Sequence, residues 1–135
     1  MTVHLDLRRS QGGDVLAKLE FRNRAASPVA LLSWVTFPTG EIDDDSFEVF
    51  VNGVKARYVG MLIKRPPPDQ EDYLRLGPGE TLTRIVNLNS GYKIDCAGAI
   101  NVRYRAFNYQ LVPDAGEGEL ESNEALLDNS HQEQR

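Results

Sequence analysis

Two turn signals inside residues 47–88 constrain the fold of this chain more than any other feature. The dipeptide Asn52-Gly53 separates two apolar stretches, and both residues tolerate the positive φ angles of a two-residue hairpin turn. Pro78-Gly79 marks a second turn ahead of another apolar stretch. Between the turns, the prolines of residues 66–68 cannot donate to a sheet ladder and favour an extended crossing over residues 64–72. This part of the chain therefore predicts three or four short antiparallel strands.

Most of the remaining body alternates apolar and polar residues, which is the period of a strand with one buried face. Residues 29–36 are instead nearly all apolar, so we expect a central strand there, with Trp34 filling the middle of the core. Strands are expected at residues 3–7, 15–22, 29–36, 47–51, 54–63, 73–76, 82–88 and 99–110. The sequence thus predicts an all-β fold, an immunoglobulin-like antiparallel β-sandwich of about seven or eight strands.

Acidic residues are concentrated towards the C-terminus. The chain has 135 residues and a net charge of −5, yet residues 1–112 contain 14 basic and 13 acidic side chains. Residues 113–135 contain seven acidic side chains, one arginine and no aromatic residue. A weak helix at residues 119–127 is an alternative, but this composition favours disorder. We therefore predict a sandwich domain at residues 1–112 and an acidic disordered tail at residues 113–135.

The histidines and the cysteine are too few and too far apart to predict a catalytic or metal site. His4, His131 and Cys96 are the only residues of these types, and they form no His-x-x-x-His or His/Cys pair that could hold zinc. Neither histidine is well placed to activate a serine, threonine or cysteine nucleophile. We expect no catalytic residue, no metal site and no cofactor, and hence a protein that is not an enzyme.

Charge and hydropathy also argue against two classes of partner. The near-neutral body lacks the concentrated basic face of a nucleic-acid-binding protein, so we expect no nucleic-acid partner. No apolar run approaches the ~20 residues of a membrane helix, so we expect no membrane partner. The N-terminal residues alternate like a strand and lack the pattern of a secretory signal, which favours a cytoplasmic location.

Two polar loops are candidate binding sites. Residues 64–72 are stiffened by three prolines, which reduces the entropy lost when a partner grips them; the plain alternative is a rigid crossover between sheets. The partner-binding residues expected in this loop are Lys64, Arg65, Pro66, Pro67, Pro68, Asp72 and Tyr73. Residues 41–45 cluster four carboxylates, which could bind calcium, although their spacing is not that of a known calcium loop and a solvated loop is favoured.

The order of these motifs resembles one protein family. The stretches FEVFVNGVKARYVG, KRPPPDQEDYLRLGPGE, TRIVNLNSGYKI and VRYRA are similar to the immunoglobulin-like, prodomain-type N-terminal domain of aspzincin (deuterolysin and peptidyl-Lys type) metalloendopeptidases. The resemblance covers residues 15–106. Its matching positions are Asn52, Gly53, Gly60, Lys64, Arg65, Pro68, Asp72, Tyr73, Pro78, Gly79, Glu80, Val86, Leu88 and Tyr92. The architecture also resembles, more distantly, the small bacterial intracellular proteinase inhibitors.

The resemblance does not extend to catalysis, because the sequence contains no His-Glu-x-x-His motif and no zinc-binding Asp motif after it. It implies a non-catalytic domain that binds a protein, such as a metallopeptidase, as a stand-alone prodomain or a protease inhibitor. The alternative is a general protein-interaction or structural module unrelated to proteases. A third hypothesis is an enzyme or a metal-dependent binder that uses residues 41–45.

Overall fold

The described residues contain strands and short 3-10 helices, and no α-helix. The computed structural model describes residues 1–94, 98–108 and 118–127. Its strands are β1 (Thr2–Arg9), β2 (Val15–Arg22), β3 (Val29–Leu32), β4 (Phe47–Val51), β5 (Val54–Lys55), β6 (Tyr73–Leu76), β7 (Thr81–Asn87), β8 (Ile100–Phe107) and β9 (Glu119–Leu127). The 3-10 helices are η1 (Ser33–Thr36), η2 (Gln70–Asp72) and η3 (Leu88–Ser90). The predicted all-β class is confirmed.

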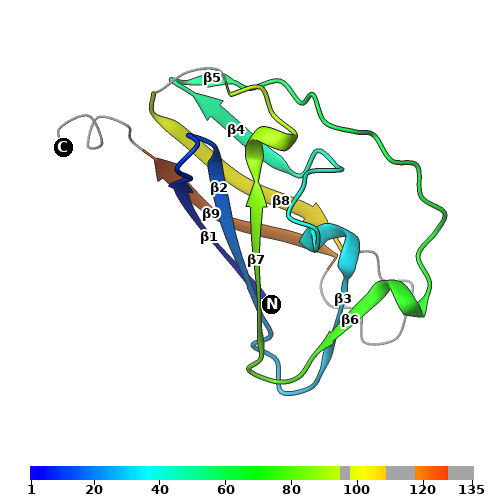
Figure 1. The fold of residues 1–135 in the computed structure, drawn as a ribbon. Helices are drawn as coiled ribbons and strands as arrows, with labels where there is room; N and C mark the ends of the chain where they lie inside the picture. The colour runs from blue at the N-terminus through cyan, green and yellow to red at the C-terminus, as the bar shows by residue number, and fades with distance from the viewer. Residues whose placement is uncertain (95–97, 109–117, 128–135) are drawn as a thin grey trace.

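Seven strands form one twisted sheet in the order β5-β4-β8-β9-β1-β2-β7, and β3 and β6 form a separate antiparallel pair. The twist brings the two halves of the large sheet to face each other, so that β8 crosses behind β2 and β7 in Figure 1. Phe21 of β2 meets Tyr104 of β8 edge to face, with ring centroids 5.7 Å apart. Strand β9 joins the halves, since it pairs antiparallel with β8 and through a parallel bridge with β1.

The core lies between these halves and is closed on one side by the small sheet. In β2 every second residue is buried, as the alternation predicted. Tyr104 is fully buried, and its hydroxyl donates a hydrogen bond to the Val35 carbonyl at 2.6 Å. The buried Asn108 side chain accepts from the Leu32 amide (2.8 Å) and donates to the Ala30 carbonyl (3.1 Å). Asn108 thereby fastens the small sheet to the end of β8.

The prediction of a disordered tail is wrong for residues 119–127, which form strand β9. Residues 119–127 form a strand between β8 and β1, so the folded body continues beyond the boundary predicted at residue 112. The acidic side chains of this strand lie beside basic ones of β8: Arg105 binds Glu121 at 2.6 Å, and Arg103 is opposite Glu124. Composition favoured disorder because it carries no information about such cross-strand partners. Residues 113–117 and 128–135 of the predicted tail lie outside the described residues.

The predicted strand at residues 29–36 is also wrong in part. Strand β3 ends at Leu32, and the chain turns into η1, where the Thr36 hydroxyl donates to the Ser33 carbonyl at 2.8 Å. Strand β3 is not in the middle of the large sheet; it pairs with β6 alone. Trp34 is consequently half-buried beside the core, whose centre is occupied by Tyr104 and its neighbours. An apolar run does not distinguish a central strand from a short strand followed by a turn.

The hairpin at Asn52-Gly53 is confirmed, with φ of 50° and 82° at these two residues. The strand after it is much shorter than predicted, because β5 covers only Val54–Lys55. Beyond β5 the chain runs extended, with one isolated bridge between Tyr58 and Tyr92. The last predicted strand is observed as β8, and residues 109–110 lie outside the described residues.

Candidate functional site

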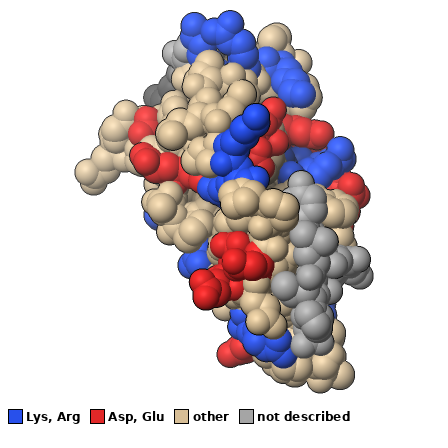
Figure 2. All heavy atoms as spheres, turned by 90° about the vertical axis from the view of Figure 1, so that its right-hand side faces the viewer, with Lys and Arg blue, Asp and Glu red and all other residues tan. Residues whose placement is uncertain are grey.

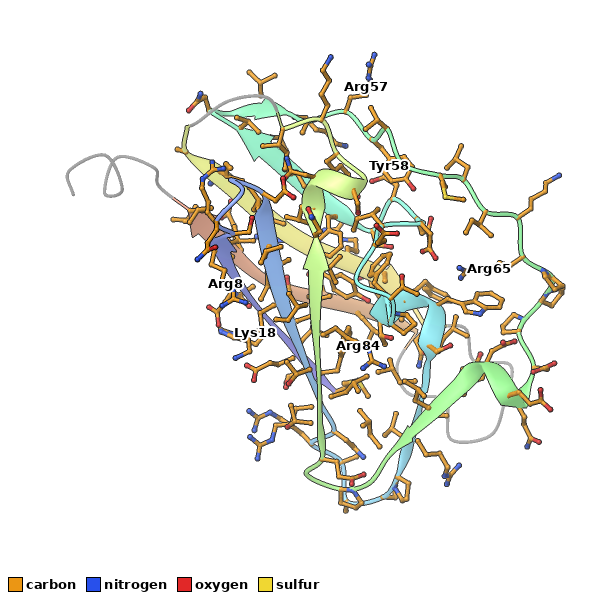
Figure 3. The ribbon with its side chains drawn as sticks, in the orientation of Figure 1. Arg8, Lys18, Arg57, Tyr58, Arg65 and Arg84 are labelled. Carbon is orange, nitrogen blue, oxygen red and sulfur yellow. The ribbon has the colours of Figure 1, made fainter. Side chains whose placement is uncertain are left out.

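Residues 56–69, which we call the crossing segment, connect β5 to η2 along one side of the molecule (Figure 1). Figure 2 shows that side, where positive and negative side chains are interleaved rather than separated into two patches. Tyr58 and Arg65 point from the crossing segment towards the body, whereas Arg57 points outwards (Figure 3). The crossing segment is therefore attached to the body at some positions and exposed at others.

A cleft of about 480 Å³ lies between the crossing segment and the loop of residues 41–45. Ile63 and Arg65 line it from the crossing segment, and Trp34 lines it from η1. The loop contributes three consecutive carboxylates, Asp43 to Asp45, and β8 contributes Arg105. The structure thus brings together the two loops that the sequence suggested separately.

Arg65 makes the main contact across this cleft. Its Nη2 atom is 2.7 Å from Asp43 Oδ2, and both side chains are about one quarter exposed. Its guanidinium group also lies over the Trp34 ring, 4.9 Å from the centroid. A partly buried ion pair combined with a cation–π contact is stronger than an exposed pair, so Arg65 holds the crossing segment to the body. The other Asp43 oxygen is buried and has no hydrogen-bond partner among the described residues.

Tyr92 fixes the end of the loop of residues 41–45 and the start of the crossing segment. Its hydroxyl donates to Asp45 Oδ1 at 2.7 Å and accepts from the Phe47 amide at 2.9 Å. Its ring packs edge to face on Tyr58, with centroids 5.4 Å apart. Backbone hydrogen bonds from Val59 to Gly91 (2.8 Å) and from Lys93 to Arg57 (3.0 Å) strengthen the attachment. Sequence reasoning assigned Tyr92 no role, since these contacts join residues more than 30 positions apart.

Burial is the main cause of the raised pKa of the Tyr92 phenol, and its hydrogen bond to the Asp45 carboxylate adds to it. Burial also raises the pKa of the Tyr104 phenol, with a smaller contribution from the charge of Asp44. The pKa of Tyr58 is raised by partial burial and then by the nearby Asp44, Asp43 and Asp45 charges. All three phenols are therefore held in the neutral form.

These shifts predict a loss of stability in alkaline solution. The folded chain keeps the Tyr92 and Tyr104 protons at a pH where the unfolded chain loses them. Their contribution is complete below about pH 10, the value for unfolded tyrosine, and falls above it by up to about 1.4 kcal/mol per pH unit for each retained proton. Urea unfolding between pH 8.5 and 11.5 measures the slope. Tyr92→Phe should show a shallower slope; a slope equal to that of the unsubstituted chain would contradict the assignment.

The other residues predicted to bind a partner fall into two groups. Asp72 and Tyr73 belong to secondary-structure elements. Asp72 Oδ2 accepts a hydrogen bond from the Asp69 amide at 3.0 Å, completing a capping box at η2, and Tyr73 is the first residue of β6. The remaining residues lie on the crossing segment itself. Lys64, Pro66 and Pro67 are exposed, and Pro68 is half-buried. Partner binding by these residues stays a prediction.

Carboxylates gather at two places. In the loop of residues 41–45, Asp43 binds Arg65, Asp45 accepts from Tyr92, and Asp44 Oδ1 accepts from the Asp45 amide at 2.9 Å. These contacts hold the loop in shape, and calcium binding by it stays a hypothesis. On the exposed face of β1 and β2, candidate ligand atoms of His4, Asp6 and Glu20 lie within 4.8 Å of one another, a group that the sequence pattern did not suggest.

The chain is similar to an "Extracellular protease" of Aeromonas hydrophila, with 32% identity over 104 residues. The matched region covers 77% of this chain but only 30% of the protease, so the chain spans less than a third of that relative. No family model matches the chain. The described part of the chain holds no helix of the length and hydropathy that crossing a membrane requires. The similarity indicates a protease-related domain.

Proposed function

We propose that this chain is a non-catalytic domain that binds a protease, acting as a prodomain or inhibitor. The observation that carries the proposal is the similarity to an extracellular protease, which covers most of this chain but a minor part of the protease. The only histidines of the chain are His4 and His131, and the sequence has no His-Glu-x-x-His motif. A match of this kind is expected when the shared region is a domain outside the catalytic one.

We further propose that the two facing halves of the large sheet represent an immunoglobulin-like domain of the type that precedes the catalytic domain in aspzincin metalloendopeptidases. The confirmed Asn52-Gly53 hairpin and the extended crossing segment, including Lys64-Arg65 and residues 66–68, are among the features that the resemblance rests on. The binding face would be the crossing segment, because exposed segments on a rigid sheet scaffold commonly carry recognition.

The test is complex formation with purified proteases. The chain is mixed with the Aeromonas hydrophila extracellular protease and, separately, with a subtilisin-type protease, and each mixture is analysed by size-exclusion chromatography and by hydrolysis of a peptide substrate. We expect a one-to-one complex with at least one of them, with a Kd of about 1 μM or tighter, and a loss of activity. Absence of both a complex and inhibition would refute protease binding. Capture of a partner without a peptidase fold would favour the general interaction module.

A further inference from the structure

Residues 59–63 expose more apolar surface than their neighbours. The exposed fractions are 51% for Val59, 66% for Met61, 83% for Leu62 and 44% for Ile63. These four residues, which we call the apolar patch, are large side chains exposed within five positions, which is unusual for a surface that meets only water. The patch lies in the crossing segment, and Ile63 at its end also lines the cleft.

The backbone of this part of the crossing segment is available for pairing. Within the described chain, no backbone–backbone hydrogen bond joins residues 60–64 to another segment. The Met61 carbonyl accepts a hydrogen bond from the Tyr58 hydroxyl, which is a side-chain contact. Residues 60–64 are thus an extended peptide without a neighbouring strand. Partners that recognise extended peptides by adding them to a sheet edge use these backbone groups for affinity and the side chains for specificity.

Both ends of the exposed stretch are fastened to the body. At one end Val59 donates to the Gly91 carbonyl and the preceding Tyr58 packs on Tyr92. At the other end Arg65 binds Asp43 and lies over Trp34, and three prolines follow. Only residues 60–64 lie between the two attachments. An extended peptide held in this way loses little conformational entropy when it is bound, which improves affinity without any further contact.

We propose that residues 60–64 enter the substrate cleft of a protease as an extended, substrate-like peptide, with Leu62 in the main apolar side-chain pocket. This inference rests on the proposed function of protease binding and adds the mode of binding. Leu62 is the most exposed residue of the patch, whereas Ile63 faces the body of this chain, where it lines the 480 Å³ cleft described above. The exposed Arg57 precedes the stretch and the exposed Lys64 is its last residue, so the fitting protease cleft has an apolar pocket and a neutral or acidic rim.

Steady-state kinetics test the substrate-like mode of binding. The measurement uses a protease that the unsubstituted chain inhibits. Inhibition by the unsubstituted chain should be competitive with a peptide substrate. Leu62→Asp should weaken it by about 10- to 100-fold, the loss typical of a central apolar contact. Arg65→Ala, which releases one attachment, should weaken it less, by about 3- to 10-fold, through lost preorganisation.

The matched control is Leu126→Asp, because Leu126 is also an exposed leucine (68%) but lies on β9, which pairs with β8 and β1. It should inhibit like the unsubstituted chain, and thermal melting of all variants excludes misfolding. Non-competitive inhibition, or equal inhibition by Leu62→Asp and Leu126→Asp, would overturn the substrate-like mode while leaving protease binding intact. Failure of the unsubstituted chain to bind any protease tested would refute the proposed function and this inference together.

Discussion

Replacing Leu120 by aspartate is expected to destabilise the protein by about 3–5 kcal/mol, a large share of the about 5–15 kcal/mol that keeps a typical domain folded. Leu120 is 3% exposed and lies in β9 between the two halves of the large sheet. The substitution removes the buried apolar contacts of the leucine and places a carboxylate in the hydrophobic core. Thermal and urea unfolding followed by circular dichroism give the change in unfolding free energy.

The same strand supplies the control. Leu126→Asp changes an exposed residue of β9, so its effect on the unfolding free energy should stay within about 0.5 kcal/mol. Comparing the two variants tests whether residues 119–127 form a strand of the folded sheet, since a disordered segment would tolerate both substitutions equally. Equal stability of the two variants would mean that residues 119–127 do not belong to the folded sheet.

Tyr104→Ala is expected to cost about 3–5 kcal/mol, because the ring is fully buried and contacts aromatic residues on both sides. The centroids of Phe21 and Phe47 lie 5.7 Å and 5.4 Å from that of Tyr104. Tyr104→Phe keeps these ring contacts and removes only the hydrogen bond to the Val35 carbonyl, so it should cost about 1–2 kcal/mol.

Urea unfolding of the two variants separates the contributions of the ring and the hydroxyl. Phe107→Ala is a suitable reference, since Phe107 is on the same strand but half exposed, and its loss should cost less than about 1 kcal/mol. A Tyr104→Ala variant as stable as Phe107→Ala would contradict a core centred on Tyr104.

Local signals in the sequence predicted local structure well. Asn52-Gly53 forms the expected turn, because the φ preference that makes it recognisable is a property of the two residues themselves. The buried alternation of β2 was likewise predicted, since a period of two reports a half-buried strand directly. Trp34 and residues 119–127 were misjudged for the opposite reason. Their environments depend on strands distant in the sequence, and a single sequence carries no signal of that pairing.

The sequence predicted the candidate site as two separate loops, residues 41–45 and 64–72. It did not predict that residues of both loops line one cleft. Arg65 was among the residues expected to contact a partner, but the structure pairs it with Asp43, which is 22 positions earlier. Tyr92, which ties the loop of residues 41–45 to β4 and packs on Tyr58 of the crossing segment, was not assigned a role. Contacts between residues this far apart in the sequence leave no local pattern, so spacing and composition could not reveal them.

We propose that this chain binds a protease through the crossing segment. Hydrogen exchange measured by mass spectrometry, with and without the Aeromonas hydrophila extracellular protease, tests it most directly. In the chain without protease, residues 60–64 have no backbone hydrogen-bond partner among the described residues, so their amides should exchange rapidly. In the complex the same amides should become protected. Unchanged exchange at residues 57–68 in the presence of saturating protease, or protection confined to other segments, would contradict protease binding through the crossing segment.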